Sequence, residues 1–325
     1  MTVEHNHNMF ADNILVHNCD EIQLHSSPEY TFTCCLSSMN LAKYDEWKDT
    51  DAIFDATVFL DCVISEFLER AKDIPHLEKA IAFTEKGRAL GLGVMGLFTH
   101  FQQEMIDPES IDAHILNTKI FQQLDKESMR ASKWLASEYG EPEWCEGFGY
   151  RNTTRLAIAP TKSTGAILGG VSEGINPIFS NVFISSTSAG DISRINPTLL
   201  GIMKERGVYN QEVIQSIEDN NGSVKHVDWL NEEEKKVFKT SFELNQFTLL
   251  KMASVRQRYI DQGQSLNLFI IKRDKGSEEF VSDLHEYAFR DNYIKGMYYI
   301  YSDSASKAER SSKNNQNNGE CESCQ

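Results

Sequence analysis

The chain has 325 residues, of which 40% are hydrophobic, and it carries a formal net charge of -16 at pH 7. This length and apolar content predict a globular protein with a sizeable core, and the acidic balance argues against a nucleic-acid partner, which needs clustered Lys and Arg. The sequence has no apolar run of about 18 residues and no secretory leader, so we expect no membrane span and, by default, a cytoplasmic location.

The first residues differ in character from the rest of the chain. Residues 1–18 are polar and rich in His and Asn, and they end in the strand-like run 14–16 before His17, Asn18 and Cys19. Residues 19–44 are typical of two short strands or extended segments around a Ser-Ser-Pro turn.

Two helices are predicted next. Apolar residues at three- and four-residue steps follow the helix-starting residues Thr50 and Asp51, which predicts an amphipathic helix with a core-facing stripe. That stripe consists of Ile53, Phe54, Val58, Phe59, Cys62, Val63 and Phe67. A longer helix is expected from about 110 to 139, ending at Gly140.

Between these helices lies a glycine-rich segment, residues 88–98, with Gly91, Gly93 and Gly96. No strand is predicted before it, and no acidic residue stands at the offset of a dinucleotide-binding motif, so that function is excluded. Close packing of backbones in a barrel explains the glycines better.

The rest of the chain alternates strands and helices, which predicts an α/β fold. A strand is expected at 156–159, running into Pro160. Further helices are expected at 197–206, 243–262 and 277–294, with strands near 182–185, 265–270 and 297–301. After Tyr301 the sequence is polar and lacks large apolar residues, so we expect a flexible tail.

The tail ends in a CxxC motif formed by Cys321 and Cys324. The chain has seven cysteines, an odd number in a large protein, which indicates reduced or redox-active thiols rather than a disulfide framework. A zinc site is the alternative, but no second half-site completes four ligands, so no metal is predicted. A dithiol on a flexible arm can instead reduce an internal disulfide by exchange.

Cys19 and Cys34, on adjoining segments that could form neighbouring strands, are candidates for the interior partner of that dithiol, and Glu21 stands two residues after Cys19. On a strand, Cys19 and Glu21 would face the same side, whereas Cys35 would face away from Cys34. A thiol beside a carboxylate suits chemistry in which sulfur acts on one substrate atom and the carboxylate takes a proton from its neighbour. An ordinary buried Cys and a solvated Glu remain the alternative.

The segment 156–170 carries Thr161, Ser163, Thr164 and Gly165 between a strand and a predicted helix. Hydroxyls and free backbone N–H groups at such a junction can hold a phosphate or diphosphate. A capped turn without a ligand is the alternative.

Tyr298 and Tyr299 are adjacent aromatic residues just before the tail. On a strand, neighbouring aromatic side chains usually place one ring inside and one outside, and the pair alone indicates nothing more.

Taken together, the motifs CDEIQL, TFTCCLSSMNLAKYDEW, PTKSTG, GMYYIYSD and the terminal CESC resemble, in their order and rough spacing, the large subunit of class I ribonucleoside-diphosphate reductases. The resemblance covers about residues 19–325. It implies the second half of a ten-stranded α/β barrel with a C-terminal region of helices and strands. The expected divisions are 1–18, the catalytic barrel portion 19–301, and the redox-active tail 302–325.

The same resemblance implies individual roles. Cys19 resembles the thiyl-radical cysteine that takes the 3′ hydrogen of the ribose, and Glu21 the carboxylate that handles the 3′ hydroxyl proton. Cys34 resembles one member of the pair that reduces the 2′ carbon and becomes a disulfide, and Cys321 and Cys324 resemble the dithiol that restores it.

Further roles concern the substrate and partners. Thr161, Ser163, Thr164 and Gly165 resemble the diphosphate-binding loop of a ribonucleoside diphosphate. Tyr298 and Tyr299 resemble the tyrosines that relay a radical from the metal-tyrosyl cofactor of a small subunit, so no cofactor is expected on this chain itself. Thioredoxin or glutaredoxin is the implied reductant, and an N-terminal half of the large subunit, carrying the other redox cysteine, is the implied partner.

The sequence departs from the family pattern in residues 1–18. The family has Asn-Leu before the radical cysteine, whereas this chain has His17 and Asn18, and HNMFADNILVHNC resembles the C-terminal end of an intein and the residue after it. In this interpretation Asn18 cyclises to break the chain, His17 and His7 assist, and Cys19 is the splicing nucleophile.

Three other hypotheses remain from the sequence. The chain can be a self-processing precursor whose activity is splicing at Asn18, or a relic without independent activity. It can also be a non-catalytic module with a zinc-binding tail. A glycyl-radical enzyme is disfavoured because the C-terminal region has no glycine-centred motif.

Overall fold

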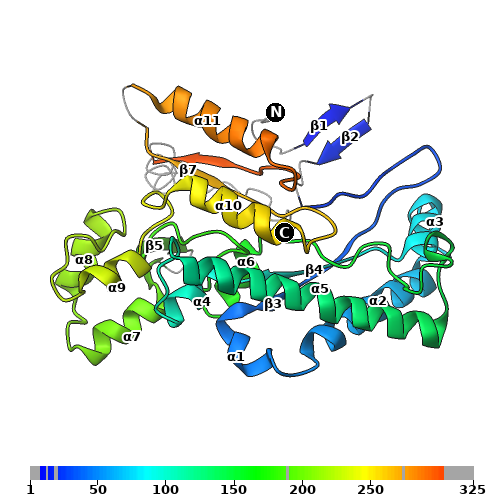
Figure 1. Cartoon of the computed structure of the whole chain (residues 1–325), viewed down its shortest axis with the longest axis horizontal. Helices are drawn as coiled ribbons and strands as arrows, with labels where there is room; N and C mark the ends of the chain where they lie inside the picture. Colours follow the sequence, from blue (N-terminus) through cyan, green and yellow to red (C-terminus); the bar gives the residue numbers. More distant parts are fainter. Residues whose placement is uncertain (1–7, 12–13, 18–20, 188–189, 273–274, 304–325) are drawn as a thin grey trace.

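The computed structural model describes residues 8–11, 14–17, 21–187, 190–272 and 275–303 (Figure 1). Strands and helices follow one another in chain order: β1 (Asn8–Ala11), β2 (Ile14–His17), β3 (Cys35–Asn40), η1 (Leu41–Lys43), α1 (Tyr44–Trp47), α2 (Ala52–Ala71), α3 (Glu78–Gly87), β4 (Leu90–Met95), α4 (Leu97–Gln103), α5 (Ile111–Tyr139), η2 (Glu143–Cys145), α6 (Lys162–Ile167), β5 (Val182–Thr187), β6 (Gly190–Ile195), α7 (Pro197–Glu205), α8 (Gln211–Asp219), α9 (Glu232–Val237), α10 (Gln246–Gln257), β7 (Leu268–Ile270), α11 (Ser277–Arg290) and β8 (Ile300–Ser302).

A parallel strand array organises the fold. Strands β3 and β4 pair in parallel, and so do β7 and β8. Between the two pairs, Leu92 bridges Leu156 and Ile158 bridges Gln264, again in parallel. The predicted strand at 156–159 is therefore extended but joins the array through single bridges. The array makes the fold α/β with the strands of a partial barrel, as expected.

Strand β4 is the glycine-rich segment, and all its residues are buried. A Cβ on Gly93 would lie 2.4 Å from the backbone oxygen of Ala157, and one on Gly91 would lie 2.4 Å from Leu36 Cδ2. Gly93 thus lets two backbones approach closely, which confirms the packing explanation there, whereas Gly91 makes room for neighbouring side chains.

This contact gives a stability prediction. We expect Gly93→Ala to lower the free energy of unfolding by about 1–3 kcal/mol, because the added methyl group forces two backbones apart. A Cβ on Gly201 in α7 would meet no heavy atom of the described residues within 4 Å, so Gly201→Ala should raise stability by about 0.5–1 kcal/mol. Urea titrations of both variants measure the difference, and equal effects would contradict the close approach at Gly93.

Helices cover the array and enclose the main core. Helix α2 packs on β3, β4 and α5, and α10 packs on α5, α11 and β7. In Figure 1 the long α5 crosses the middle of the molecule, with α10 and α11 above it. The main apolar cluster includes Leu92, Phe101, Phe121, Leu250 and Phe269.

The predicted helix after Asp51 exists as α2, but its predicted apolar stripe is partly wrong. Ile53 is buried, whereas Phe59 is 63% exposed and Cys62 and Val63 are also exposed. The buried face instead includes the polar residues Thr57 and Asp61. An ion-pair network at Asp61 holds this polar part of the helix inward.

The remaining predictions hold to different degrees. Helix α5 begins after Ser110, whose side chain accepts a hydrogen bond from Ala113 N–H, and ends at Gly140, as expected. Helices α7, α10 and α11 and strands β5, β7 and β8 lie within or close to the predicted ranges, although α10 is shorter. Elements α3, α4, β6, α8 and α9 were not predicted from the sequence.

A group of three helices and a β-hairpin lie outside the parallel strand array. Helices α7, α8 and α9 enclose a smaller apolar cluster that includes Leu199, Met203, Ile217 and Phe238. Strands β1 and β2 form an antiparallel hairpin that pairs with no other strand in the described residues. Within the described ranges, no helix has the length and apolarity needed to cross a membrane.

Candidate active site

The amino ends of β3 and β4 meet the segment 262–265 at the candidate site. Cys34 directly precedes β3, and a Cβ on Gly91 in β4 would lie 3.0 Å from its sulfur. Gln262 Nε2 donates to Cys34 Sγ at 3.6 Å. Predicted Cys34 therefore lies against a loop more than two hundred residues further along the chain.

The surroundings of Cys34 disfavour its thiolate. Burial raises the pKa of the Cys34 thiol to about 12, with Cys35 and Glu21 also raising it and the Gln262 hydrogen bond lowering it. Burial also raises the pKa of Cys35, whose charged neighbour is Asp61. The two thiols thus meet different neighbours, as the alternation of side chains along a strand predicts.

Glu21 contacts the same segment 262–265 and is buried, with 5% of its surface exposed. Its Oε2 accepts a hydrogen bond from Ser265 Oγ at 2.9 Å, and its backbone oxygen accepts one from Gly263 N–H at 2.8 Å. The alternative of a solvated Glu21 is therefore wrong.

The local geometry around Glu21 differs from the prediction. Glu21 lies at a bend and not in a strand, so the same-face argument for Cys19 and Glu21 does not apply as stated. The strand that follows Cys34, β3, pairs with β4. Because Cys19 lies outside the described residues, the pairing of its segment with that of Cys34 stays a prediction.

Gln262 connects these groups, and it was not predicted from the sequence. It is fully buried. Besides Cys34, its Nε2 reaches Leu90 O at 2.9 Å and Thr154 Oγ1 at 3.2 Å, while its Oε1 accepts from Gln23 N–H at 3.1 Å. The sequence YIDQGQSLN has many polar residues just before a buried strand, and this pattern could have indicated that some of them face the site.

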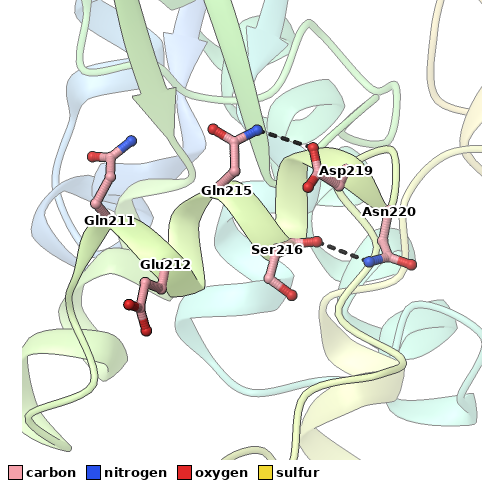
Figure 2. Close-up of a pocket in the computed structure, with 6 residues that line it drawn as sticks. All are labelled: Gln211, Glu212, Gln215, Ser216, Asp219 and Asn220. Carbon is pink, nitrogen blue, oxygen red and sulfur yellow. Dashed lines mark hydrogen bonds between the residues drawn. The ribbon is translucent and has the colours of Figure 1, made fainter.

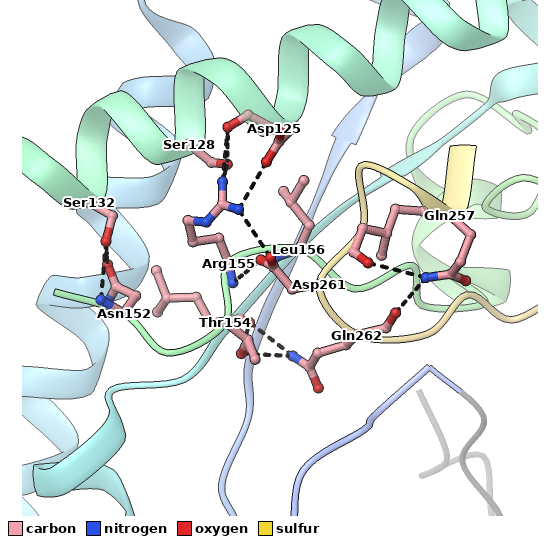
Figure 3. A network of polar contacts seen from close by, with 12 residues as sticks. Asp125, Ser128, Ser132, Asn152, Thr154, Arg155, Leu156, Gln257, Asp261 and Gln262 are labelled. Atoms are coloured by element: carbon pink, nitrogen blue, oxygen red, sulfur yellow. Dashed lines mark hydrogen bonds and ion pairs between the residues drawn. The ribbon is translucent and has the colours of Figure 1, made fainter. Parts of the chain in front are cut away.

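A polar network fixes the loop that carries Gln262 (Figure 3). The Arg155 guanidinium lies between Asp125 on α5 and Asp261, at 2.9 Å and 3.0 Å. The Asp261 carboxylate also accepts from the backbone N–H groups of Arg155 and Leu156. Helix, extended segment and loop are therefore tied together beside the site.

The predicted phosphate loop exists as a turn leading into α6. Thr161 is buried in a left-handed conformation with φ of 55°, and its Oγ1 accepts from Gly174 N–H at 2.9 Å. Gly165 is buried, and a Cβ there would lie 3.1 Å from Val171 O, whereas Thr164 is exposed and Ser163 half-buried. The role of these residues in phosphate binding stays a prediction.

Tyr298 and Tyr299 are close together, with ring centroids 4.0 Å apart. Both are half-buried, which differs from the usual arrangement of one ring inside and one outside. Tyr298 N–H donates to Leu266 O, and Tyr299 O accepts from Leu268 N–H, so the pair lies alongside the stretch that follows Ser265.

Other predicted site residues lie outside the described part of the chain. These are His7, Asn18, Cys19, Cys321 and Cys324, and for His17 only the backbone, in β2, is described. No group of three or more potential metal-binding side chains is found among the described residues.

A surface pocket of about 410 Å³ lies on α8 (Figure 2). All its lining residues, Gln211, Glu212, Gln215, Ser216, Asp219 and Asn220, come from that helix and its end. It contains none of the predicted site residues and no convergent catalytic groups, so geometry and chemistry favour the site at Cys34.

Comparisons with known proteins show which chains this one is similar to. A family model described as the ribonucleotide reductase barrel domain matches residues 3–148 and 142–300. The ribonucleoside-diphosphate reductase large subunit of Invertebrate iridescent virus 6 is 38% identical over 314 residues, covering 95% of this chain and 32% of its own length. The large subunit of Danio rerio is 31% identical, covering 87% of this chain and 39% of its own.

A solved structure is also similar. The Actinobacillus ureae class Id ribonucleotide reductase alpha subunit matches with a TM-score of 0.79 and 42% identity, covering 88% of this chain and 52% of that chain. This chain spans about half or less of the length of the relatives it matches. The family match begins at residue 3, so it does not separate residues 1–18 from the barrel.

Proposed function

Because this chain belongs to the family defined by the ribonucleotide reductase barrel domain, we propose that it is the C-terminal catalytic part of a ribonucleoside-diphosphate reductase large subunit. It works after joining, or assembling with, an N-terminal half. The observation that carries the proposal is the buried Glu21 carboxylate, held by Ser265 of the same segment whose Gln262 donates to the Cys34 thiol.

The chemistry divides among these groups. A Cys19 thiyl radical takes the 3′ hydrogen of the ribose, and Glu21 accepts the 3′ hydroxyl proton. Cys34 and a cysteine of the N-terminal half then supply two electrons to the 2′ carbon, which loses its hydroxyl as water, and the two thiols become a disulfide. Cys321 and Cys324 reduce that disulfide by exchange and are themselves reduced by thioredoxin or glutaredoxin.

The remaining predicted residues bind the substrate or transfer the radical that starts the reaction. Thr161, Ser163, Thr164 and Gly165 hold the substrate diphosphate at the turn into α6. Tyr298 and Tyr299 pass the radical from the metal-tyrosyl cofactor of a small subunit, and their ring separation of 4.0 Å supports a relay.

The test is reconstitution. This chain, co-expressed with a candidate N-terminal half and supplied with small subunit and thioredoxin, should reduce CDP to dCDP. Each component alone should be inactive. A soluble, verified assembly that does not form dCDP would contradict the proposal.

A second function, splicing at Asn18 and Cys19, is favoured by the hairpin formed by β1 and β2. This hairpin pairs Asn8 with His17 and makes no ladder with the barrel strands among the described residues. It ends at His17, one residue before the proposed cleavage site. We infer that residues 1–18 are the C-terminal end of a split intein whose remainder accompanies the N-terminal half.

Intact masses test this inference in the same co-expression. We expect a joined product that lacks residues 1–18, and we expect both Asn18→Ala and Cys19→Ala to abolish it, because each removes a reacting group. Glu29→Gln, an exposed change beyond the junction, is the control. Enzyme activity without any change in mass would refute splicing while leaving the reductase assignment intact.

A further inference from the structure

We propose that Gln262 is a positioning residue for Cys34: its side-chain amide orients the sulfur and stabilises the thiolate form by donating a hydrogen bond. No motif in the sequence pointed to this residue. The proposal rests on the assignment of Cys34 as a redox thiol, but its test requires neither substrate nor partner protein.

The Gln262 amide has fewer hydrogens than acceptors around it. Nε2 carries two hydrogens, whereas three acceptors surround it: Leu90 O at 2.9 Å, Thr154 Oγ1 at 3.2 Å and Cys34 Sγ at 3.6 Å. Thr154 Oγ1 itself donates to Leu90 O at 3.0 Å, so these two acceptors already form a pair. One hydrogen of the amide can serve that pair while the other points at the sulfur.

The amide is also held so that it cannot turn away from the sulfur. Its Oε1 accepts from Gln23 N–H at 3.1 Å, which fixes the orientation of the two ends of the amide. The preceding residue, Asp261, is held by Arg155 and by two backbone N–H groups (Figure 3). A buried donor held on both sides is pre-organised for its acceptor.

The hydrogen bond from Gln262 matters for the ionisation of Cys34 because the other groups around the sulfur disfavour its thiolate. The titratable groups acting on Cys34 are Glu21 and Cys35, and both oppose a thiolate, as does burial. The Gln262 hydrogen bond is the one influence among them that favours it. Hydrogen bonds to a charged group are stronger than those to a neutral one, so the amide acts mainly when the sulfur is ionised.

The hydrogen bond from Gln262 determines which sulfur of the disulfide is attacked and which one leaves. When a tail thiolate attacks the sulfur of the other cysteine in the disulfide, a new S–S bond forms there and the bond to Cys34 breaks. The electron pair of that bond leaves on Cys34 as a thiolate, which then takes a proton. Stabilising that thiolate makes Cys34 the better leaving group, since a thiol of lower pKa leaves faster.

The test is the rate at which iodoacetamide alkylates Cys34 in the isolated, reduced full chain at pH 9, followed by peptide mass spectrometry. Gln262→Met keeps the shape and removes the donor. We expect its alkylation rate at Cys34 to fall about tenfold, corresponding to a thiol pKa raised by about one unit. The pH profile should move upward by the same amount.

The direction of the change in alkylation rate separates a chemical role of Gln262 from a structural one. If Gln262 only packs the site, its removal opens the site and alkylation becomes faster or stays unchanged, and either result would overturn the proposal. Gln262→Glu, which keeps the acceptor for Gln23 N–H, should also slow the reaction and serves if the Met variant is unfolded.

Thr154→Val is the matched control. It removes another partner of the same amide without touching the sulfur, so its alkylation rate should stay within about twofold of wild type. An equal loss in this control would show that the loop, and not the Gln262 donor, sets the reactivity. Absent reductase activity in the assembled enzyme, by contrast, would count against the proposed function without changing these rates.

Discussion

Glu21→Gln is expected to lower kcat/KM of the assembled reductase by about 10²–10⁴-fold, the range typical of a lost general base. The substitution keeps the size of the side chain and leaves an oxygen that can accept from Ser265 Oγ, so the local fold should survive. It removes the carboxylate that, in the proposed function, takes the 3′ hydroxyl proton. CDP reduction with saturating small subunit and thioredoxin measures the effect.

The control is Glu29→Gln, which changes an exposed carboxylate on the same stretch of chain. Its activity should equal that of the wild type. Circular dichroism of both variants checks that the fold is intact. Activity of Glu21→Gln within tenfold of wild type would rule out the assigned proton transfer.

Asp61→Ala should lower the free energy of unfolding by about 3–5 kcal/mol, because it leaves buried charge without a partner. The Asp61 carboxylate accepts from Arg88 Nε and Nη2, both at 2.8 Å, from Arg151 Nε at 3.2 Å and from Asn152 Nδ2 at 2.9 Å. The Asp61 and Arg88 side chains are only 5% and 6% exposed. Urea unfolding followed by circular dichroism measures the loss.

Glu66→Ala on the same helix is the matched comparison. Its partner Arg70 lies one turn away, and both side chains are exposed, so the change should stay within about 1 kcal/mol. Similar losses in the two variants would mean that the burial of the Asp61 network does not determine its contribution.

Prediction of the fold from sequence succeeded where local rules dominate. Helix α5 has a side-chain N-cap at Ser110 and a glycine end at Gly140, and both signals stand in the sequence. The apolar stripe of α2 failed because periodicity assumes that apolar side chains face inward. Asp61 is buried by arginines that come from positions 88 and 151, and α2 alone contains no sign of them.

The candidate site divides in the same way. From the sequence, Cys34 and Glu21 could be identified as residues able to take part in catalysis. The residues that surround them in the fold could not be predicted. The hydrogen bond from Gln262 to Cys34 joins residues 228 positions apart, and Ser265 reaches Glu21 across 244. Such contacts depend on which strands become neighbours, which no local pattern encodes. Gln262 and Ser265 were missed for that reason.

The parallel array also has a consequence for how the protein acquires its structure. Every pairing in it joins segments separated by a long crossover, and the last pairing requires β8, near the end of the described chain. Contacts of such long sequence separation slow folding. During synthesis, β3 and β4 can pair early, but Gln262 reaches Cys34 only after most of the chain has left the ribosome. Until then the nascent chain exposes the unpaired edge of segment 156–158, whose other edge bridges β4, so chaperone demand should be highest before residue 264 emerges.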